Sequence, residues 1–262
     1  MSNRQKKRSW RQHCNDDKDD DVQATTMPNG VRTWRKNGVL HRDGDRPAYI
    51  GVDGSLWWYQ NGKLHRDGDL PAYIDRDGTQ LWYQHGLVHR DGDLPAIIES
   101  DGKQYWYQNG RPHRDGDLPA EVWPNGRRVW YQRGKRHRDG DKPARIEESG
   151  SQTWWRHGKM HRENDQPACV FSDGVRSWWW DGRLHRDGDK PAYVSETDRV
   201  LGWYRHGKEH RDNDLPAHIY ADGTQWWCQD GQRHRDGGRP AVVWGNGERE
   251  WWLHGKRIAA PP

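Results

Sequence analysis

A single 24-residue pattern is repeated along almost the whole chain. Residues 58–78 read WYQNGKLHRDGDLPAYIDRDG, residues 82–102 read WYQHGLVHRDGDLPAIIESDG and residues 106–126 read WYQNGRPHRDGDLPAEVWPNG. A fixed period between 20 and 50 residues is the signature of a repeat array, in which each repeat is too small to bury a core alone and packs on its neighbours. We therefore expect a row of repeats rather than one globular core.

One tryptophan marks each repeat, and the rest of the pattern keeps its distance from that ring. A His follows the Trp by seven residues, Pro-Ala follows the His by six, and a β-branched residue lies two beyond the Ala. A single inserted residue near 196–200 shifts the later copies by one. From this phase we predict a basic flexible tail at 1–9, a degenerate capping repeat at 10–33, tandem repeats at 34–257 and a C-terminal tail at 258–262.

Each repeat contains a strong hairpin signal. Asp-Gly or Asn-Gly lies between runs of alternating aromatic and β-branched residues, as in 74–82. Two copies read Pro-Asn-Gly, at 124–126 and 28–30, and proline suits the first position of a three-residue loop with a G1 bulge. That register makes Ile74 oppose Gln80 and Ala72 oppose Trp82. A second signal, such as Asn61-Gly62, opens the connection through His-Arg-Asp-Gly-Asp to the next Pro-Ala.

The fold class is therefore predicted as all-β, an elongated and twisted antiparallel hairpin meander of about ten repeats with no helix. The register places the constant Ala, Ile/Val and Trp on one packed face. The structural core is expected at Trp34, Trp58, Trp82, Trp106, Trp130, Trp154, Trp178, Trp203, Trp227, Trp251, Ile50, Ile74, Ile98 and Val122. The opposite, more variable face is the candidate binding face, at Trp57, Tyr59, Tyr83, Tyr105, Tyr107, Tyr131, Trp155, Trp179, Tyr204, Trp226 and Trp252.

Composition narrows the class and the location. Hydrophobic residues make up 31%, and they include 19 Trp but one Phe, so the apolar area is carried mainly by rings. The 43 basic and 39 acidic residues are interleaved, which does not indicate a continuous phosphate-binding stripe, and a nucleic-acid partner is not expected. Three cysteines at variable positions favour a reducing compartment. No apolar run is long enough for a signal peptide or a membrane span, so an intracellular protein is predicted.

The N-terminal tail has two interpretations. Lys6-Lys7-Arg8 is either part of a solvated basic tail or a nuclear-localisation patch, which would place the protein in the nucleus.

The stretch NGKLHRDGDLPAYIDRDGTQLWYQ at 61–84 resembles MORN repeats. Asn61–His65 and the Asp-Gly turn match that pattern, whereas Arg66 stands where MORN repeats have Gly, and Asp67–Ala72 replaces the following Gly-containing stretch. The arrays of the form WYxNGxxHRDGDxPA also resemble those of amoeba-infecting giant DNA viruses, pandoraviruses in particular, and of some phages. The resemblance covers residues 10–257. It implies a scaffold for protein contacts or dimerisation, with membrane lipid as a further partner, and a location in the host cytoplasm or the virion.

The His-Arg-Asp-Gly-Asp motif suggests chemistry but favours structure. His-Arg-Asp occurs in kinase catalytic loops, yet no DFG or Gly-rich loop accompanies it, and a catalytic residue is needed once, not in every copy. Histidines one repeat apart would lie about 9.6 Å from one another, too far to share zinc without large convergence. Two carboxylates per loop leave calcium as an alternative to a turn in which Asp caps backbone N–H groups and Arg pairs with an Asp. We expect no cofactor and no catalytic or metal-ligating residue.

Two functions are compatible with the pattern. The first is a non-enzymatic scaffold that binds a protein or itself through the variable face or the sheet edges. The second is a multivalent array that binds a lipid headgroup, a glycan or a nucleic acid on its aromatic side chains, and the variable face also resembles, more weakly, the Trp/Tyr repeats of cell-wall choline- or glucan-binding modules. Because the available face is the one that varies, the pattern favours a single protein partner.

Overall fold

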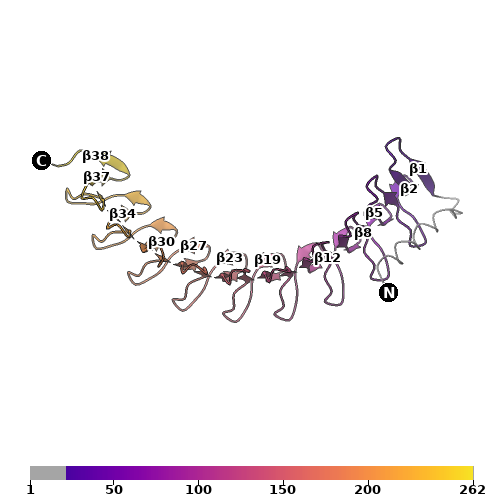
Figure 1. Ribbon diagram of the computed structural model, residues 1–262, viewed down its shortest axis with the longest axis horizontal. Coiled ribbons are helices and arrows are strands. Elements are labelled where there is room, and N and C mark those ends of the chain that lie inside the picture. The colour runs from indigo at the N-terminus through magenta and orange to yellow at the C-terminus, as the bar shows by residue number, and fades with distance from the viewer. Residues whose placement is uncertain (1–21, 262) are drawn as a thin grey trace. The chain divides into compact units, whose positions relative to one another are not determined.

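The computed structural model describes residues 22–261, which form β-strands and turns without a helix (Figure 1). The predicted all-β array of antiparallel hairpins is confirmed for these residues. The predicted basic tail at 1–9, the Lys6-Lys7-Arg8 patch and residues 10–21 of the predicted capping repeat lie outside the described residues. Within them, no helix is long and apolar enough to cross a membrane.

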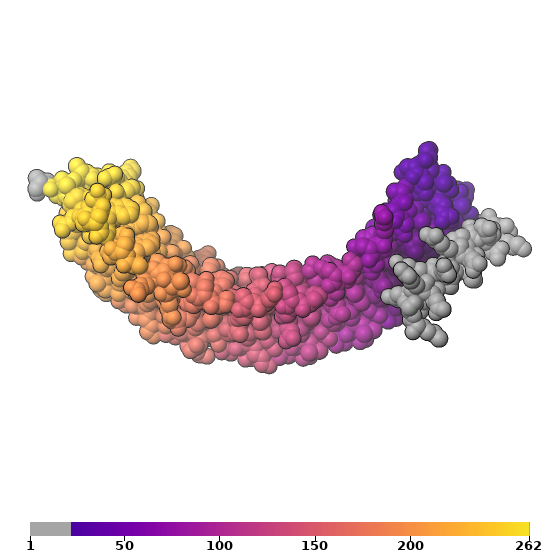
Figure 2. Space-filling model, viewed as in Figure 1, coloured from indigo at the N-terminus to yellow at the C-terminus, as the bar shows by residue number. Residues whose placement is uncertain are grey.

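The chain divides into two compact units, Met1–Ser100 and Asp101–Pro262. The 24-residue period continues across this boundary, so the sequence pattern does not mark it. Figure 1 shows the hairpins of each unit following one another in chain order, and Figure 2 shows the side chains of successive repeats in the C-terminal unit packed together.

The long ladder of the N-terminal unit joins seven strands, each antiparallel to the next. In ladder order they are β1 (Gln23–Thr26), β2 (Arg32–Lys36), β4 (Tyr49–Ile50), β5 (Leu56–Trp57), β8 (Tyr73–Ile74), β9 (Gln80–Leu81) and β12 (Ile97–Ile98). Short strands beside it are β3 (Val39–Leu40), which pairs with β2, and the hairpins β6 (Tyr59–Gln60) with β7 (Lys63–Leu64) and β10 (Tyr83–Gln84) with β11 (Leu87–Val88).

The C-terminal unit continues the same plan. Its long ladder runs β13 (Gln104–Tyr105), β16 (Glu121–Val122), β17 (Arg128–Val129), β20 (Arg145–Ile146), β21 (Gln152–Thr153), β24 (Cys169–Val170), β25 (Arg176–Ser177), β28 (Tyr193–Ser195), β29 (Val200–Gly202), β32 (His218–Ile219), β33 (Gln225–Trp226), β36 (Val242–Val243) and β37 (Arg249–Leu253). Its short hairpins are β14 (Tyr107–Gln108) with β15 (Arg111–Pro112), β18 (Tyr131–Gln132) with β19 (Lys135–Arg136), β22 (Trp155–Arg156) with β23 (Lys159–Met160), β26 (Trp179–Trp180) with β27 (Arg183–Leu184), β30 (Tyr204–Arg205) with β31 (Lys208–Glu209), and β34 (Cys228–Gln229) with β35 (Gln232–Arg233). The last strand, β38 (Lys256–Ile258), pairs with β37.

The first hairpin of the repeat closes as predicted, except in the copy with the inserted residue, where Ser195 faces Val200 across residues 196–199. Ile74 faces Gln80, the Asp75 amide donates to the Thr79 carbonyl at 2.9 Å, and the Gly78 amide donates back to the Asp75 carbonyl at 3.2 Å. Gly78 has φ +100°, a conformation that glycine adopts without a Cβ clash. This is a three-residue loop with a G1-type bulge, so the predicted loop and its register up to Leu81 are confirmed.

The sequence prediction of one hairpin per repeat is wrong, because the second turn signal closes a second hairpin. In that hairpin Tyr59 faces Leu64 and Gln60 faces Lys63. The two turn residues Asn61 and Gly62 have φ of +48° and +76°, the left-handed pair that a two-residue type I′ turn needs. Each repeat therefore supplies one hairpin to the long ladder and one short hairpin beside it.

The constant tryptophan is the point at which the chain passes between the two hairpins. The Trp58 amide donates to the carbonyl of Ala72 in the next ladder hairpin at 2.8 Å, and the Trp58 carbonyl accepts from the His65 amide at 3.1 Å. One residue thus bonds forward to the ladder and also closes the short hairpin. The expected cross-strand pair Ala72–Trp82 is replaced by this arrangement, since the regular pairing of that hairpin ends at Leu81.

The Trp and Ala residues of the predicted core are mostly buried, whereas its β-branched residues are only half-buried. The constant alanines from Ala48 to Ala241 are fully buried. The buried tryptophans are Trp34, Trp58, Trp82, Trp106, Trp130, Trp154, Trp178, Trp203 and Trp227, while Trp251 is half-buried. Ile50, Ile74, Ile98 and Val122 are only half-buried.

The most deeply buried ladder side chains lie on the opposite side of the sheet. Val129, Cys169 and Val242 are at most 2% exposed, and by the register they share the side of Tyr105 rather than that of Val122. The physical reason is the second hairpin, which the sequence prediction lacked and which places Tyr204 beside the Gly202 and His218 positions of the ladder. We call this covered side of the long ladder the inner surface and the side of Ile74 and Val122 the outer surface.

Candidate functional site

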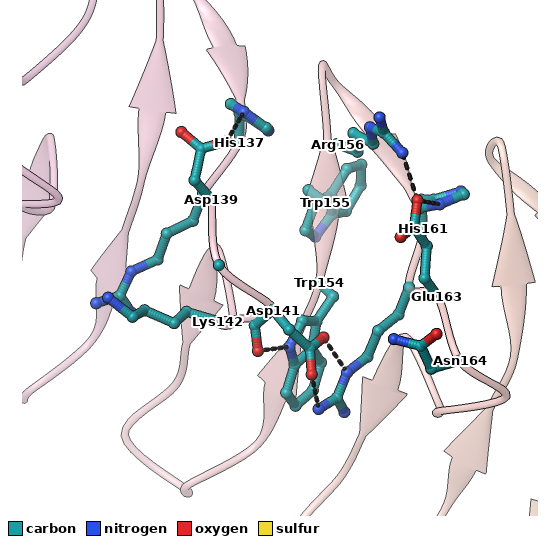
Figure 3. Close-up of a pocket in the computed structure, with 13 residues that line it drawn as sticks. His137, Asp139, Asp141, Lys142, Trp154, Trp155, Arg156, His161, Glu163 and Asn164 are labelled. Carbon is teal, nitrogen blue, oxygen red and sulfur yellow. Dashed lines mark hydrogen bonds and ion pairs between the residues drawn. The ribbon is translucent and has the colours of Figure 1, made fainter.

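The constant polar residues of the repeat form one joint between neighbouring repeats, shown for residues 137–164 in Figure 3. The Trp154 ring nitrogen donates to the backbone carbonyl of Asp141 in the preceding loop at 3.1 Å. Arg162 grips both carboxylate oxygens of the same Asp141, at 2.7 Å from Nε and 3.0 Å from Nη2. Its guanidinium lies 3.8 Å from the centre of the Trp154 ring, and Nη1 donates to the Pro167 carbonyl at 3.2 Å. A single arginine therefore ties a ring, its own loop and the preceding loop together.

The same joint recurs at almost every repeat boundary. The paired residues are Arg66 with Asp45, Arg90 with Asp69, Arg138 with Asp117, Arg162 with Asp141, Arg186 with Asp165, Arg211 with Asp189 and Arg235 with Asp214. This geometry confirms the interpretation of the motif as a turn in which Arg pairs with Asp of an adjacent loop.

The chain drops the aspartate where no arginine follows. Gly238 stands at the second aspartate position of the last loop, and Ala259 stands 24 residues after Arg235, where the next arginine would fall. The Gly238 carbonyl still accepts the ring N–H of Trp251 at 2.9 Å, a bond that needs no side chain. The carboxylate is thus present where it has a partner, which is the behaviour of a structural group.

The constant histidine makes a second joint. Nε2 of His137 lies 3.1 Å from Asp139 Oδ1, and Nδ1 accepts the backbone N–H of His157 in the next repeat at 3.4 Å. Because a backbone N–H can only donate, Nδ1 is the acceptor in this contact and Nε2 is the ring nitrogen left to donate to Asp139. The His137 and His157 rings also stack at 4.3 Å, and Gln132 donates to the other oxygen of Asp139. Both nitrogens of the His137 ring therefore have partners within the repeats.

Carboxylates of the loops are held ionised by these contacts. Hydrogen bonds from Arg138 and then from Lys142 lower the pKa of Asp117 to about 2, and Arg186 with Lys190 does the same for the pKa of Asp165. Calcium, the alternative considered for these loops, would have to displace the cations that already hold the oxygens. The described residues contain no group of three or more His, Cys, Asp or Glu side chains placed to hold a metal ion.

A shallow pocket of about 230 Å³ lies between two successive loops, and Figure 3 shows its lining. Its lining includes Trp154, Asp141, His137 and Glu163, most of which already take part in the two joints. The pocket is therefore a gap between repeats lined by groups that bond to one another, and it offers little free hydrogen-bonding capacity to a ligand.

The eleven residues of the candidate binding face are all half-buried on or beside the inner surface. These are Trp57, Tyr59, Tyr83, Tyr105, Tyr107, Tyr131, Trp155, Trp179, Tyr204, Trp226 and Trp252. The ladder rings on this surface contact one another, as in Trp57 and Tyr73, whose ring centres are 4.2 Å apart. On the short hairpins, Trp155 and Trp179 donate their ring N–H groups to Thr153 and Ser177, both at 2.8 Å. The surface is aromatic, ordered and varied from repeat to repeat.

One group of polar side chains on the inner surface was missed from the sequence. Glu209 of β31 lies 3.3 Å from His218 Nε2 and 3.4 Å from the Cys228 sulfur. Contact with the His218 imidazole lowers the pKa of Glu209, whereas burial raises the pKa of the Cys228 thiol to about 12. In the earlier repeats these three positions are held by residues such as Leu64, Tyr73 and Tyr83. The sequence signal for this cluster is that Glu209, His218 and Cys228 replace less polar residues at three positions of the repeat.

The contacts of this cluster indicate local pairing rather than catalysis. A buried thiol with a raised pKa is a poor nucleophile, because the thiolate is the reactive form. Tyr204, next to His218, also has its pKa raised to about 12 by burial.

Comparisons with known proteins add no assignment. No family model matches the sequence, and no curated protein matches it.

Proposed function

We propose that this protein is a non-enzymatic repeat scaffold that binds a protein partner along its inner surface. The observation that supports it best is that the constant and the variable residues of the repeat have different contacts. Hydrogen bonds to neighbouring repeats are formed by the constant residues, namely Trp, His, Arg, Asp and the Pro-Ala backbone. What is left for a partner is the part of the repeat that varies.

A variable surface suits one large partner better than many identical small ligands. A multivalent array for a repeated ligand gains avidity from copies of one site. Here the inner ladder positions change from Tyr105 to Val129, Thr153 and Ser177 in successive repeats. Val129 and Ser177 are buried whereas Tyr105 and Thr153 are half-buried, so neither the chemistry nor the exposure of a site is copied. Half-buried aromatic side chains are the usual anchors of protein interfaces. The resemblance to MORN repeats supports the same proposal, and a viral origin remains part of it.

The test is affinity capture from a lysate of the source cells followed by mass spectrometry. Wild type is compared with a variant in which Tyr59, Tyr83, Tyr107 and Tyr131 become Ser. The matched control changes four outer-surface residues, Ile74, Ile98, Val122 and Ile146, to Thr. Both variants are first checked for unchanged β circular dichroism.

A stoichiometric protein that is lost in the tyrosine variant and kept in the outer-surface control supports the scaffold. Retention of a lipid, glycan or nucleic acid in place of a protein, lost in the tyrosine variant and kept in the outer-surface control, would refute it in favour of the multivalent ligand-binding array. Loss of the partner in both variants would show that the inner surface is not the contact.

A further inference from the structure

A line of exposed cations runs along the short-hairpin turns of the C-terminal unit. Each is the residue that follows the turn glycine in β15, β19, β23, β27 and β31. They are Arg111, Lys135, Lys159, Arg183 and Lys208, and we call them the turn ridge. In the sequence they are 24 or 25 residues apart and are separated by acidic loops, so no linear pattern indicates a basic stripe.

Backbone hydrogen bonds hold the turn ridge in a fixed line. From the second ridge position on, the amide of the turn glycine donates to the preceding short hairpin: Gly134 to the Pro112 carbonyl, Gly158 to the Arg136 carbonyl and Gly182 to the Met160 carbonyl, at 2.8, 2.8 and 2.9 Å. The stem of Lys135 also lies across Gly158. Four steps of two strand spacings, about 9.6 Å each, give a ridge about 38 Å long.

Most of the ridge charge is not neutralised. Lys159 pairs with Asp181 at 2.8 Å, whereas the other four ridge cations have no ion-pair partner within residues 22–261. Arg133, on the turn before Lys135, adds to the charge. The acidic residues of these short hairpins are few. Asp181 pairs with Lys159 and also interacts electrostatically with the nearby Arg183, and Glu209 is turned inward against His218.

The fold itself does not require cations here. In the N-terminal unit the same position is Val39, Lys63 and Leu87, and the two apolar residues are 43% and 50% exposed. Like charges about 10 Å apart repel rather than stabilise, although salt screens them at this distance. The ridge is therefore a surface property of the C-terminal unit and not part of the repeat's own bonding.

Flat rings lie beside the cations. Trp180 is 50% exposed and its ring centre is 4.4 Å from that of His161. His157 and His206 are exposed turn residues that stack on histidines of the preceding repeats, at 4.3 and 4.4 Å. Cations that track a backbone, together with rings on which bases can stack, are the two features that bind single-stranded nucleic acid.

We propose that the turn ridge binds a single-stranded nucleic acid, with Lys135, Arg183 and Lys208 contacting phosphates and Trp180 stacking on a base. A single file of cations fits a linear polyanion. A duplex would leave the rings without bases to stack on. The proposal concerns a different surface from the protein-binding inner surface, so either one stands without the other.

The test uses fluorescence anisotropy of a labelled, mixed-sequence single strand of about 16 nucleotides, with the full chain. The ridge variant carries Lys135→Gln, Arg183→Gln and Lys208→Gln. The control carries Arg76→Gln, Arg128→Gln and Arg249→Gln, which removes the same charge from exposed positions elsewhere. Melting curves confirm that both fold.

We expect the ridge variant to bind at least tenfold more weakly and the control to bind within about twofold of wild type. Three lost phosphate contacts should also make the slope of log affinity against log salt shallower by about 2, measured between about 50 and 200 mM. Trp180→Ala should weaken binding to the single strand without changing that slope.

Three results would overturn the proposal. Equal weakening in the ridge and control variants would show that the attraction is only non-specific charge. Equal or tighter binding of the matching duplex would remove the role of the rings. Binding of vesicles rich in phosphatidylserine, without binding of the oligonucleotide, would identify an anionic membrane as the partner of the ridge.

Discussion

Arg138 reaches back across a repeat boundary to hold both carboxylate oxygens of Asp117, with Nε at 2.6 Å and Nη2 at 3.2 Å, while its guanidinium covers the Trp130 ring at 3.9 Å. The contact joins residues 21 positions apart and links two repeats side chain to side chain. We expect Arg138→Lys to lower the free energy of unfolding by about 1–2 kcal/mol, because lysine keeps the charge but loses the bidentate grip and the flat stacking surface.

Urea denaturation measures this effect. Arg76→Lys, on an exposed hairpin loop, is the control and should change little. A double-mutant cycle with Asp117→Asn should show coupling between the two side chains. Equal effects of Arg138→Lys and Arg76→Lys would contradict the role given to the joint.

The buried tryptophan of each repeat should be essential to folding. Trp106 is 7% exposed, and replacing a packed ring by alanine costs about 3–5 kcal/mol. We expect Trp106→Ala to lower the melting temperature sharply. Trp180→Ala, at a ring that is 50% exposed, is the matched control and should cost much less. Similar melting temperatures for the two variants would show that the packed position is assigned wrongly.

Acid should weaken the joints through their aspartates. Cation contacts lower the pKa of Asp117 and Asp165 from 3.8 to about 2 in the folded chain. A depressed pKa means that the unfolded chain takes up protons first, so this stabilisation is present above the unfolded pKa and is lost as pH falls from about 4 to 2. We expect the melting temperature to decline over that range.

The double variant Asp117→Asn/Asp165→Asn should be less stable at neutral pH and should show a shallower decline in acid. Glu248→Gln, at an exposed carboxylate outside both joints, should follow wild type. A decline in acid that is unchanged in the double variant would show that other groups cause it.

The middle residue of the Arg-Asp-Gly-Asp loop should tolerate asparagine but not valine. Gly140 has φ +73°, and two other copies place Asn164 and Asn213 at the matching position with φ of +58° and +59°. Asparagine adopts this left-handed conformation several-fold more readily than most residues, whereas β-branched side chains clash there. We expect Gly140→Asn to change the melting temperature little and Gly140→Val to cost about 1–2 kcal/mol. Equal destabilisation by both would indicate that side-chain volume, and not backbone conformation, is limiting.

The two cysteines of the described chain should be unreactive in the folded protein. Burial raises the pKa of Cys169 to about 11 and that of Cys228 to about 12. In a Cys14→Ser background at pH 8, a chromogenic disulfide reagent should release no signal until denaturant is added, because the thiolate is scarce and covered. Both thiols should then react, and Cys228→Ser should halve the signal. Rapid labelling of the native chain would contradict their burial.

Much of the fold follows from local patterns in the sequence. The Asp-Gly and Asn-Gly turns have the residues that left-handed conformations require, so the three-residue loop and its register were predictable from 74–82 alone. The 24-residue period likewise predicted that neighbouring repeats must share a core. The sequence also predicted that Arg of the motif pairs with an Asp, because the two side chains carry opposite charges. It did not fix which two loops the ion pair joins.

The tertiary structure decided which surface is covered. The sequence has the turn signal of the second hairpin, Asn61-Gly62, but strands of two residues leave too little periodicity to predict pairing. Because these hairpins lie over one side of the ladder, Val129 is fully buried and Val122 is not, although both fit a strand equally well.

The row of cations in the turn ridge likewise results from the packing of successive short hairpins and not from the order of residues in the chain. Lys135 and Lys159 are 24 residues apart in the chain, with acidic loop residues between them. The backbone hydrogen bond from Gly158 to the Arg136 carbonyl holds the two short hairpins side by side. Of the intervening aspartates, Asp141 pairs with Arg162 and Asp139 contacts His137. The sequence by itself determined a β-hairpin repeat and the residues that join its copies. Only the folded array decided which side chains became core, inner surface and ridge, since those depend on contacts between repeats that no single repeat contains.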